Sequence, residues 1–238
     1  MLLKPTMRAA ICCGILITGL SAFSPKEADN TLTAKEKKEG WQLLFDGKDT
    51  KGWHNYQGKQ MDSWEIIDGQ LHCKSEGVTK RADLTTDGEY GDFELAVDWK
   101  VDPKSNSGII YRANENHDHS YESGPEYQLI DDKGYPGKVE DNQKSGSDYA
   151  MHAASSLVTK PVGEYNHTVI KVKGAHVEHY LNGVKVVEFD YWTDDWKKLK
   201  DASKWKDKPE YGMLKAGHIC LQDHGGGAWF KNIKIRKI

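Results

Sequence analysis

The sequence of 238 residues contains few cysteines, no block of basic residues and no apolar run as long as a membrane span. Cys12 and Cys13 lie in the apolar N-terminal run, which leaves only Cys73 and Cys220 in the rest of the chain. These two could form a disulfide or remain free buried thiols, and the sequence leaves both open. Because the formal net charge is −3 and no basic block occurs, we expect no nucleic acid among the partners.

The motifs of several large enzyme classes are also missing. The sequence has no Gly-x-Ser-x-Gly elbow, no glycine loop that would cradle phosphates and no dinucleotide fingerprint. Their absence argues against redox or phosphoryl-transfer chemistry within this chain. The sequence is instead rich in aromatic residues, since eight Trp and eleven Tyr supply large apolar area per residue.

The N-terminus has the pattern of an export signal. Lys4 and Arg8 precede a short uncharged apolar run over residues 9–23, which ends in small residues. This run is shorter than the roughly 20 apolar residues of a membrane-spanning helix. We therefore predict a signal peptide over residues 1–24, a protein exported to the periplasm, cell surface or medium, and no membrane span. A buried N-terminal strand is the alternative.

The body of the chain predicts strands. Residues 25–40 are polar, and we expect a tether there with a short helix over residues 33–39. After this segment, apolar and polar residues alternate in short runs over residues 93–99, 166–173, 176–181, 184–189, 219–222 and 230–238. Asn182-Gly183 is the strongest short hairpin signal because both residues tolerate positive φ. The pattern predicts one all-β domain over residues 41–238, a two-sheet antiparallel β-sandwich, with only residues 191–211 irregular or partly helical.

Several stretches, spread in order along the chain, carry a family resemblance. They are residues 41–48 (WQLLFDGK), 52–53 (GW), 90–95 (YGDFEL), 106–109 (NSGI), 124–132 (GPEYQLIDD) and 219–225 (ICLQDHG). In these stretches the sequence resembles the bacterial 3-keto-disaccharide hydrolase domain family. One departure is Tyr165, where the family often has Trp. The resemblance implies a concanavalin A-like jelly roll that binds sugars on the concave outer face of one sheet.

The densest polar cluster lies on predicted strands. Period-two alternation places Glu126 and Gln128 on one face of a strand and Tyr127 and Leu129 on the opposite, core-facing side. If the strand of Arg112 is a neighbour, its planar guanidinium could reach Glu126 or a substrate oxygen. The alternative is a simple cross-strand ion pair between Glu126 and Arg112.

Further candidates lie at strand ends and in loops. His224 follows Gln222 and Asp223 just before three glycines, where it could act as an acid or base on a mobile rim or be a solvated turn residue. The candidate substrate-binding residues are Asn106, Gln128, Gln222, His152, Asp131 and Trp192. Trp192 is included because stacking on a sugar ring needs a flat apolar face at a wet surface, a role that Trp196 would also suit.

No metal site is evident, although calcium stays open. Sandwiches of this class often hold calcium through Asp side chains and carbonyl oxygens, and Asp131 and Asp132 are the candidates here. His117, Asp118 and His119 lack further ligands at a workable spacing for zinc, which favours a solvated loop.

Two functions of different classes remain open. The resemblance implies an enzyme acting on 3-keto-glycosides, in which a base removes the C2 proton, the C1 substituent leaves and water adds. Glu126 would be the base, His224 an acid or second base, and Arg112, Asn106 and Gln128 donors to the substrate. A separate sugar oxidoreductase would supply the ketone. The alternative is a non-catalytic carbohydrate-binding module of lectin-like fold, because fold does not determine function.

Overall fold

Two antiparallel sheets form the body of the protein. The computed structural model describes residue 1 and residues 28–238. The larger sheet contains β1 (Gln42–Leu43), β3 (Trp64–Ile67), β4 (Gln70–Cys73), β6 (Phe93–Val101), β9 (Asn166–Lys173), β10 (His176–Leu181), β11 (Val184–Asp190) and β13 (Ala228–Lys237). The smaller sheet contains β2 (Trp53–Asn55), β5 (Leu84–Thr86), β7 (Asn106–Ala113), β8 (Glu126–Ile130) and β12 (His218–Leu221). The strand orders are β11-β10-β9-β6-β13-β4-β3, with β1 beside β13, and β2-β5-β12-β7-β8.

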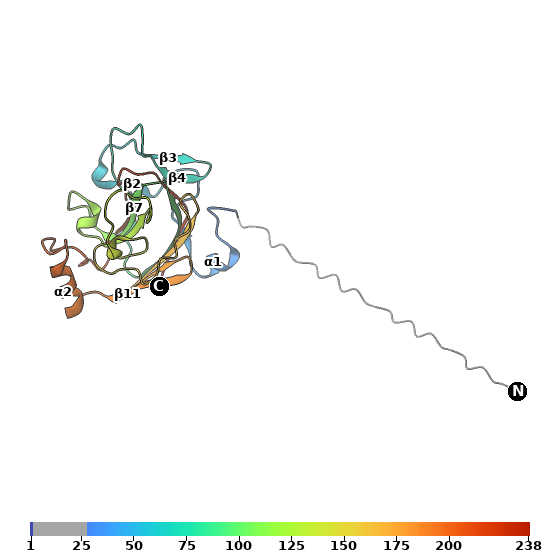
Figure 1. Cartoon of the computed structure of the whole chain (residues 1–238). Helices are drawn as coiled ribbons and strands as arrows, with labels where there is room; N and C mark the ends of the chain where they lie inside the picture. Colours follow the sequence, from blue (N-terminus) through green and yellow to red (C-terminus); the bar gives the residue numbers. More distant parts are fainter. Residues whose placement is uncertain (2–27) are drawn as a thin grey trace.

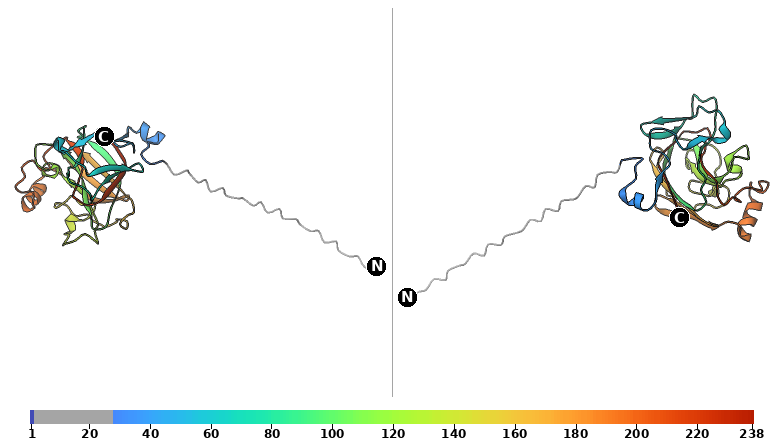
Figure 2. Two further views of the ribbon diagram at one scale, coloured as in Figure 1. Left: turned by 90° about the horizontal axis from the view of Figure 1, so that it is seen from above. Right: turned by 180° about the vertical axis from the view of Figure 1, so that it is seen from behind.

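The helices are short and lie outside the sheets. They are α1 (Ala34–Lys38), α2 (Asp194–Ala202) and the 3-10 turns η1 (Tyr56–Gly58), η2 (Ser120–Glu122) and η3 (Asp141–Gln143). α1 and α2 lie on opposite sides of the molecule in the front and rear views (Figures 1 and 2). The predicted all-β sandwich with a partly helical insertion is thereby confirmed.

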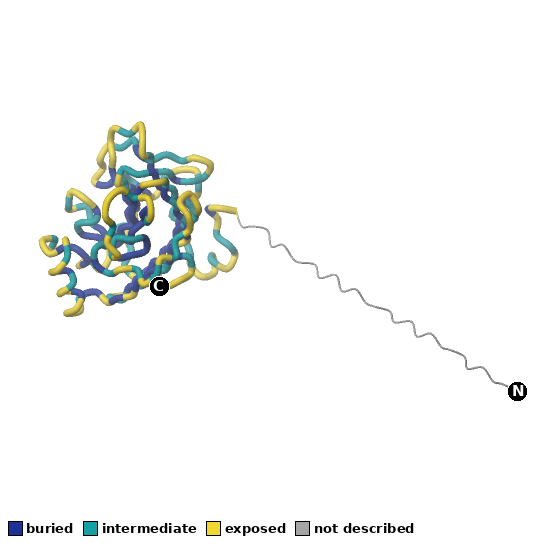
Figure 3. Tube along the Cα trace, viewed as in Figure 1, coloured by how far each residue is buried: buried dark blue, intermediate teal, exposed yellow. Residues whose placement is uncertain are grey.

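The core lies between the two sheets and follows the predicted alternation. On β6, Phe93 and Trp99 are fully buried together with the residues that alternate between them. Trp99 keeps its indole N–H satisfied by donating to Thr168 Oγ1 over 2.8 Å. Figure 3 shows this buried centre, with most exposed residues at the periphery of the molecule. Asn182 and Gly183 form the tip of the β10–β11 hairpin with φ of 49° and 83°, as predicted.

The structure bears on the predicted disulfide and, only in part, on the predicted signal peptide. Cys73 on β4 and Cys220 on β12 are buried free thiols in different sheets. The predicted signal peptide falls almost entirely on residues 2–27, outside the described residues. Within the described part of the chain, no helix is long and apolar enough to cross a membrane.

Residues 28–40 were expected to be a tether, but they dock on the sandwich. Asn30 accepts a hydrogen bond from the backbone N–H of Asn232 on β13 (2.8 Å) and donates to the Gly69 carbonyl (2.7 Å). Asn232 in turn accepts from the backbone N–H of Asn30. α1 begins with a capping box formed by Thr33 and Glu36. The segment is therefore part of the fold from residue 28 onward.

We expect Asn30→Ala to lower the free energy of unfolding by about 1–3 kcal/mol, because it leaves partly buried backbone groups of Asn232 and Gly69 without their partner. Chemical denaturation of the full chain measures this. Asn116→Ala is the matched control, since Asn116 is exposed and should change stability by less than about 0.5 kcal/mol. Equal denaturation midpoints for the two variants would contradict the docked segment.

Candidate active site

A polar cavity of about 330 Å³ lies on the outer face of the five-stranded sheet. Asp83 precedes β5, Gln222 follows β12, and Asn106 and Glu126 begin β7 and β8, so four neighbouring strands contribute to its floor. Loop residues form its rim. The complete lining is Arg81, Asp83, Asn106, His119, Tyr121, Glu126, Tyr149, Lys204, Gln222, Asp223 and His224.

Glu126 is the central carboxyl group of this cavity. Tyr127 and Leu129 point into the core, as predicted, and leave Glu126 on the opposite face of β8. The side chain lies flat over Gly108 of β7: a Cβ added at Gly108 would come within 2.8 Å of both Cγ and Cδ of Glu126. The residue is only 3% exposed, and this burial raises the pKa of Glu126 to about 8. Lys204 and Gln222 act in the opposite direction by favouring the carboxylate.

The other two carboxyl groups of the cavity are bound to protein donors. Asp83 accepts hydrogen bonds from Ser120 Oγ (2.5 Å) and the backbone N–H of Asp223 (2.9 Å), and burial raises its pKa. Asp223 Oδ1 forms an ion pair with Arg81 at 2.7 Å, while its Oδ2 is buried with no hydrogen-bond partner among the described residues. Glu126 is therefore the carboxyl group least committed to neighbouring protein groups.

Two amide oxygens face the cavity without a partner. Asn106 Oδ1 and Gln222 Oε1 are buried, and no described residue donates a hydrogen bond to either of them. A buried acceptor without a donor is costly and rare in folded proteins. Both oxygens can accept hydrogen bonds from a ligand, and sugar hydroxyl groups are donors of the required kind.

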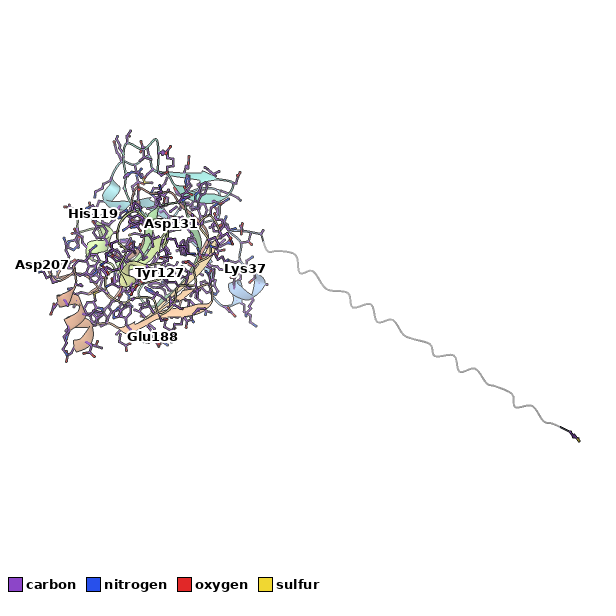
Figure 4. The ribbon with its side chains drawn as sticks, in the orientation of Figure 1. Lys37, His119, Tyr127, Asp131, Glu188 and Asp207 are labelled. Carbon is purple, nitrogen blue, oxygen red and sulfur yellow. The ribbon has the colours of Figure 1, made fainter. Side chains whose placement is uncertain are left out.

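The rim combines imidazole and aromatic groups. His224 is exposed as a residue, yet partial desolvation of its ring and the charge of Lys204 lower its pKa, which favours the neutral ring. His119 stacks on Tyr121 with ring centroids 4.9 Å apart. Figure 4 shows His119 on the side of the molecule that carries Asp207, away from Lys37 on α1.

Four of the predicted site residues come together in this cavity, namely Glu126, His224, Asn106 and Gln222. Gln128 lies on the same face of β8 as Glu126 but does not line the cavity. Its side-chain oxygen instead accepts a hydrogen bond from the backbone N–H of Leu129 at 3.0 Å.

Arg112 was expected to reach Glu126, and the structure corrects this because β7 contains a bulge. Ala113 pairs with His218 and Ile110 with Cys220, so three steps along β7 match two along β12. The extra residue, Arg112, has a φ of 51°. Its side chain therefore leaves the face that carries Ile110, and the period-two argument fails at this point.

The guanidinium of Arg112 is bound at a different place. It donates to the carbonyl of Gly91 (2.9 and 3.1 Å), to the carbonyl of Gly174 (2.9 Å) and to Asp92 (3.4 Å). Arg112 does not line the cavity and forms no ion pair with Glu126. Arg112 instead ties together the loops that flank β6 and β9.

His152 and Trp192 also lie away from the cavity. His152 Nδ1 lies 2.8 Å from Asp148 Oδ2, which accepts its hydrogen bond, and the ring stacks on Phe189 with ring centroids 4.2 Å apart. Trp192 uses its indole N–H to donate to the carbonyl of Gly212. Both residues hold loops in place, and Trp196, the other stacking candidate, is buried.

Asp131 stabilises a turn and does not fit a calcium ion. Its carboxylate accepts hydrogen bonds from the backbone N–H groups of Lys104, Lys133 and Gly134. These positive N–H dipoles surround the oxygens that a cation would need. Asp132 is likewise occupied by backbone and hydroxyl donors.

Seven residues that line the cavity were not among the predicted site residues, namely Arg81, Asp83, His119, Tyr121, Tyr149, Lys204 and Asp223. Asp83 could have been found, since it shares a face with Thr85 in the alternation of β5. The other residues lie in loops, where no periodic pattern indicates which way a side chain points.

Comparisons with known proteins agree with a carbohydrate site. Residues 40–236 match the family model described as a 3-keto-alpha-glucoside-1,2-lyase-like domain. A 3-keto-disaccharide hydrolase of Bacteroides thetaiotaomicron is 34% identical over 228 residues, which cover 83% of this chain and 78% of the relative. The crystal structure of a candidate glycosyl hydrolase from Parabacteroides distasonis superimposes with a TM-score of 0.83 at 39% identity, covering 89% of this chain and 100% of that one. A second such structure from the same organism gives a TM-score of 0.68 at 33% identity, with coverages of 83% and 99%.

Proposed function

The chain belongs to the 3-keto-alpha-glucoside-1,2-lyase-like family, and from that premise we propose that it cleaves glycosides whose sugar carries a ketone at C3. The relative named 3-keto-disaccharide hydrolase supports a carbohydrate hydrolase of this kind. The observation that carries the proposal is the desolvated carboxyl group of Glu126 in a polar cavity. A base is most effective when its pKa lies near the working pH, and a pKa of about 8 meets that condition.

A conventional glycosidase would need a second free carboxyl group. Such enzymes use two carboxyl groups placed on either side of the glycosidic bond, one as acid and the other as base or nucleophile. Here Asp83 is held by Ser120 and Asp223 by Arg81. Elimination beside a ketone needs only one strong base, because the carbonyl group acidifies the C2 proton.

The proposed reaction has two steps. Glu126 removes the proton from C2, the electrons pass to the C3 oxygen as an enolate, and the bond from C1 to the leaving oxygen then breaks. The proton held by Glu126 goes to the leaving oxygen, which yields an enone. Water then adds its hydroxyl to C1, and neutral His224 carries the remaining proton to C2, so the net result is hydrolysis.

The polar floor of the cavity offers hydrogen bonds to a sugar, and a 3-keto substrate requires an enzyme that forms the ketone. Asn106 and Gln222 offer acceptors to its hydroxyl groups. A ketone at C3 arises when a sugar hydroxyl is oxidised, so an oxidoreductase must act before this protein. We propose that the two proteins work in the same exported compartment, in agreement with the export signal expected from residues 1–24.

Aglycone release tests this function directly. The purified protein is incubated with an aryl glucoside and, separately, with its 3-keto derivative, and release of the aryl group is followed with time. Release from the keto compound alone is the expected result. Equal release from both would indicate an ordinary glycosidase, and sugar binding without release would indicate a binding module.

We expect kcat/KM for the keto compound to rise about tenfold per pH unit below a pH of about 8 and to level off above it. The active form carries Glu126 as carboxylate, and burial raises the pKa of this group to about 8. His224 must be neutral, which higher pH also favours. The rate without protein is subtracted at each pH, because 3-keto-glycosides also eliminate in base. A flat profile between about pH 6 and 8 would mean a base with an ordinary carboxyl pKa and would contradict the assignment.

A further inference from the structure

The enolate in the proposed reaction needs a positive group at its oxygen. Arg112, the cation that the sequence predicted for this role, does not line the cavity. Charge that develops in a transition state is stabilised best by donors that are already in place. Arg112 is bound to loop carbonyls away from the cavity. Arg81 reaches the cavity, but its guanidinium is held by Asp223 and by the carbonyls of Lys74 and Ser75.

Lys204 is the remaining strong cation of the cavity, and aromatic rings hold it there. It follows α2 directly, and its ammonium nitrogen lies 4.4 Å from the ring centroid of Trp205 and 4.5 Å from that of Tyr149. The ring of Tyr121 lies 5.9 Å away. Ring faces attract a cation without neutralising its charge.

The aromatic support is itself anchored. Trp205 is buried, stacks on Tyr211 with ring centroids 4.3 Å apart, and donates its indole N–H to the carbonyl of Tyr149 at 3.1 Å. The backbone next to Lys204 is therefore fixed, although the segment after α2 has no regular secondary structure. This gives the ammonium group a defined place at the rim.

The ammonium group of Lys204 is free to bind a ligand. Among the described residues, none forms a hydrogen bond or a salt bridge with it. The acidic group whose charge acts on Lys204 is Glu126, and the influence is mutual. Base and cation thus face one cavity without being joined in a contact ion pair, which leaves room for a substrate between them.

We propose that Lys204 is a catalytic residue that donates a hydrogen bond to the C3 oxygen as Glu126 removes the C2 proton. This assignment rests on the proposed function, since it needs a ketone at C3. The ammonium group binds the neutral ketone weakly and the enolate strongly, so its effect falls mainly on kcat. Its charge also favours the carboxylate form of Glu126 and so increases the active fraction of the base.

The test compares Lys204→Met, Lys204→Arg and Lys198→Met. Methionine keeps an unbranched chain over the rings without the charge, and arginine keeps the charge. Lys198 is the control because it lies on α2 with its side chain exposed beside Asp195. Circular dichroism verifies that each variant is folded. The assays are aglycone release, with kcat and KM separated, and exchange of the C2 proton of a 3-keto-glucoside in D₂O followed by NMR.

We expect Lys204→Met to lower both kcat and C2 exchange by roughly 10²–10³-fold, the usual loss on removing one oxyanion donor, with KM changed only a few-fold. The rising limb of its pH profile should move to higher pH, because the charge that favours ionised Glu126 is gone. Lys204→Arg should recover part of the rate, and Lys198→Met should match the wild type.

Two other results separate the two proposals. If the wild type is active and Lys204→Met retains kcat and exchange within threefold with an unmoved pH limb, Lys204 has no catalytic role while the proposed function stands. If the wild type neither releases aglycone nor exchanges the C2 proton, the proposed function fails and the role of Lys204 fails with it.

Discussion

Replacing Glu126 by glutamine is expected to lower the rate of aglycone release from a 3-keto-glucoside by roughly two to four orders of magnitude, the usual contribution of a general base. Glutamine keeps the shape of the side chain and its capacity to form hydrogen bonds but cannot take up a proton. Substrate binding should change little, because the contacts proposed for Asn106 and Gln222 remain possible. Steady-state kinetics gives kcat, and titration with the substrate under non-turnover conditions gives the affinity.

At alkaline pH the Glu126→Gln variant should be more stable than the wild type. This comparison separates a catalytic role of Glu126 from a structural one. The pKa of Glu126 rises from its ordinary value of 4.5 to about 8 on folding, so the folded state holds a proton that the unfolded state has lost. Between these values the wild type loses stability as pH rises, by up to about 5 kcal/mol in all. Glu126→Gln carries no such penalty, so its unfolding midpoint should exceed that of the wild type at about pH 8.5 and match it near pH 4. A less stable variant with full turnover would show that Glu126 serves only the fold.

Gly108→Ala is expected to lower kcat by roughly 10–100-fold while the protein still folds, because a displacement of about 1 Å at a catalytic group can cost that much. Gly108 lies in β7 with a φ outside the positive range, so alanine suits its backbone. The three atoms nearest to the added Cβ all belong to the side chain of Glu126. The methyl group therefore displaces the base and leaves other neighbours in place.

A double-mutant cycle tests whether Gly108 acts through Glu126. In the Glu126→Gln background the residual rate no longer depends on where that side chain lies, so adding Gly108→Ala should change it less than twofold. Independent, multiplicative losses would mean that Gly108→Ala disturbs the cavity by another route. Thermal unfolding of all four proteins controls for a general loss of structure.

The sequence predicted the strands well because alternation is a local property. The pattern around Glu126 placed Tyr127 and Leu129 in the core and Glu126 on the opposite face, and the structure confirms this. The hairpin at Asn182-Gly183 was also predictable, because its turn depends on two adjacent residues.

The predictions failed for residues whose positions depend on more than the alternation along one strand. A single bulge in β7 changed the direction of the Arg112 side chain from the one that period-two alternation predicts, and no residue type in β7 indicates a bulge. The rim of the cavity is assembled from loops that are far apart in the chain, such as those of His119, Tyr149 and Lys204. These loops come together only because of how the two sheets pack, and the sequence of a single loop does not indicate that packing.

The docking of residues 28–40 has a practical consequence for handling the protein. α1 and α2 lie on opposite sides of the molecule, and Lys204 at the rim of the cavity follows α2 directly (Figures 1 and 2). A bead, a fusion partner or an electrode linker that is attached ahead of residue 28 is therefore joined to the described part of the protein on the side opposite the cavity. Long oligosaccharides should reach an immobilised protein as readily as small aryl glucosides do, so the N-terminus is the preferred point of attachment for a biosensor or a flow reactor.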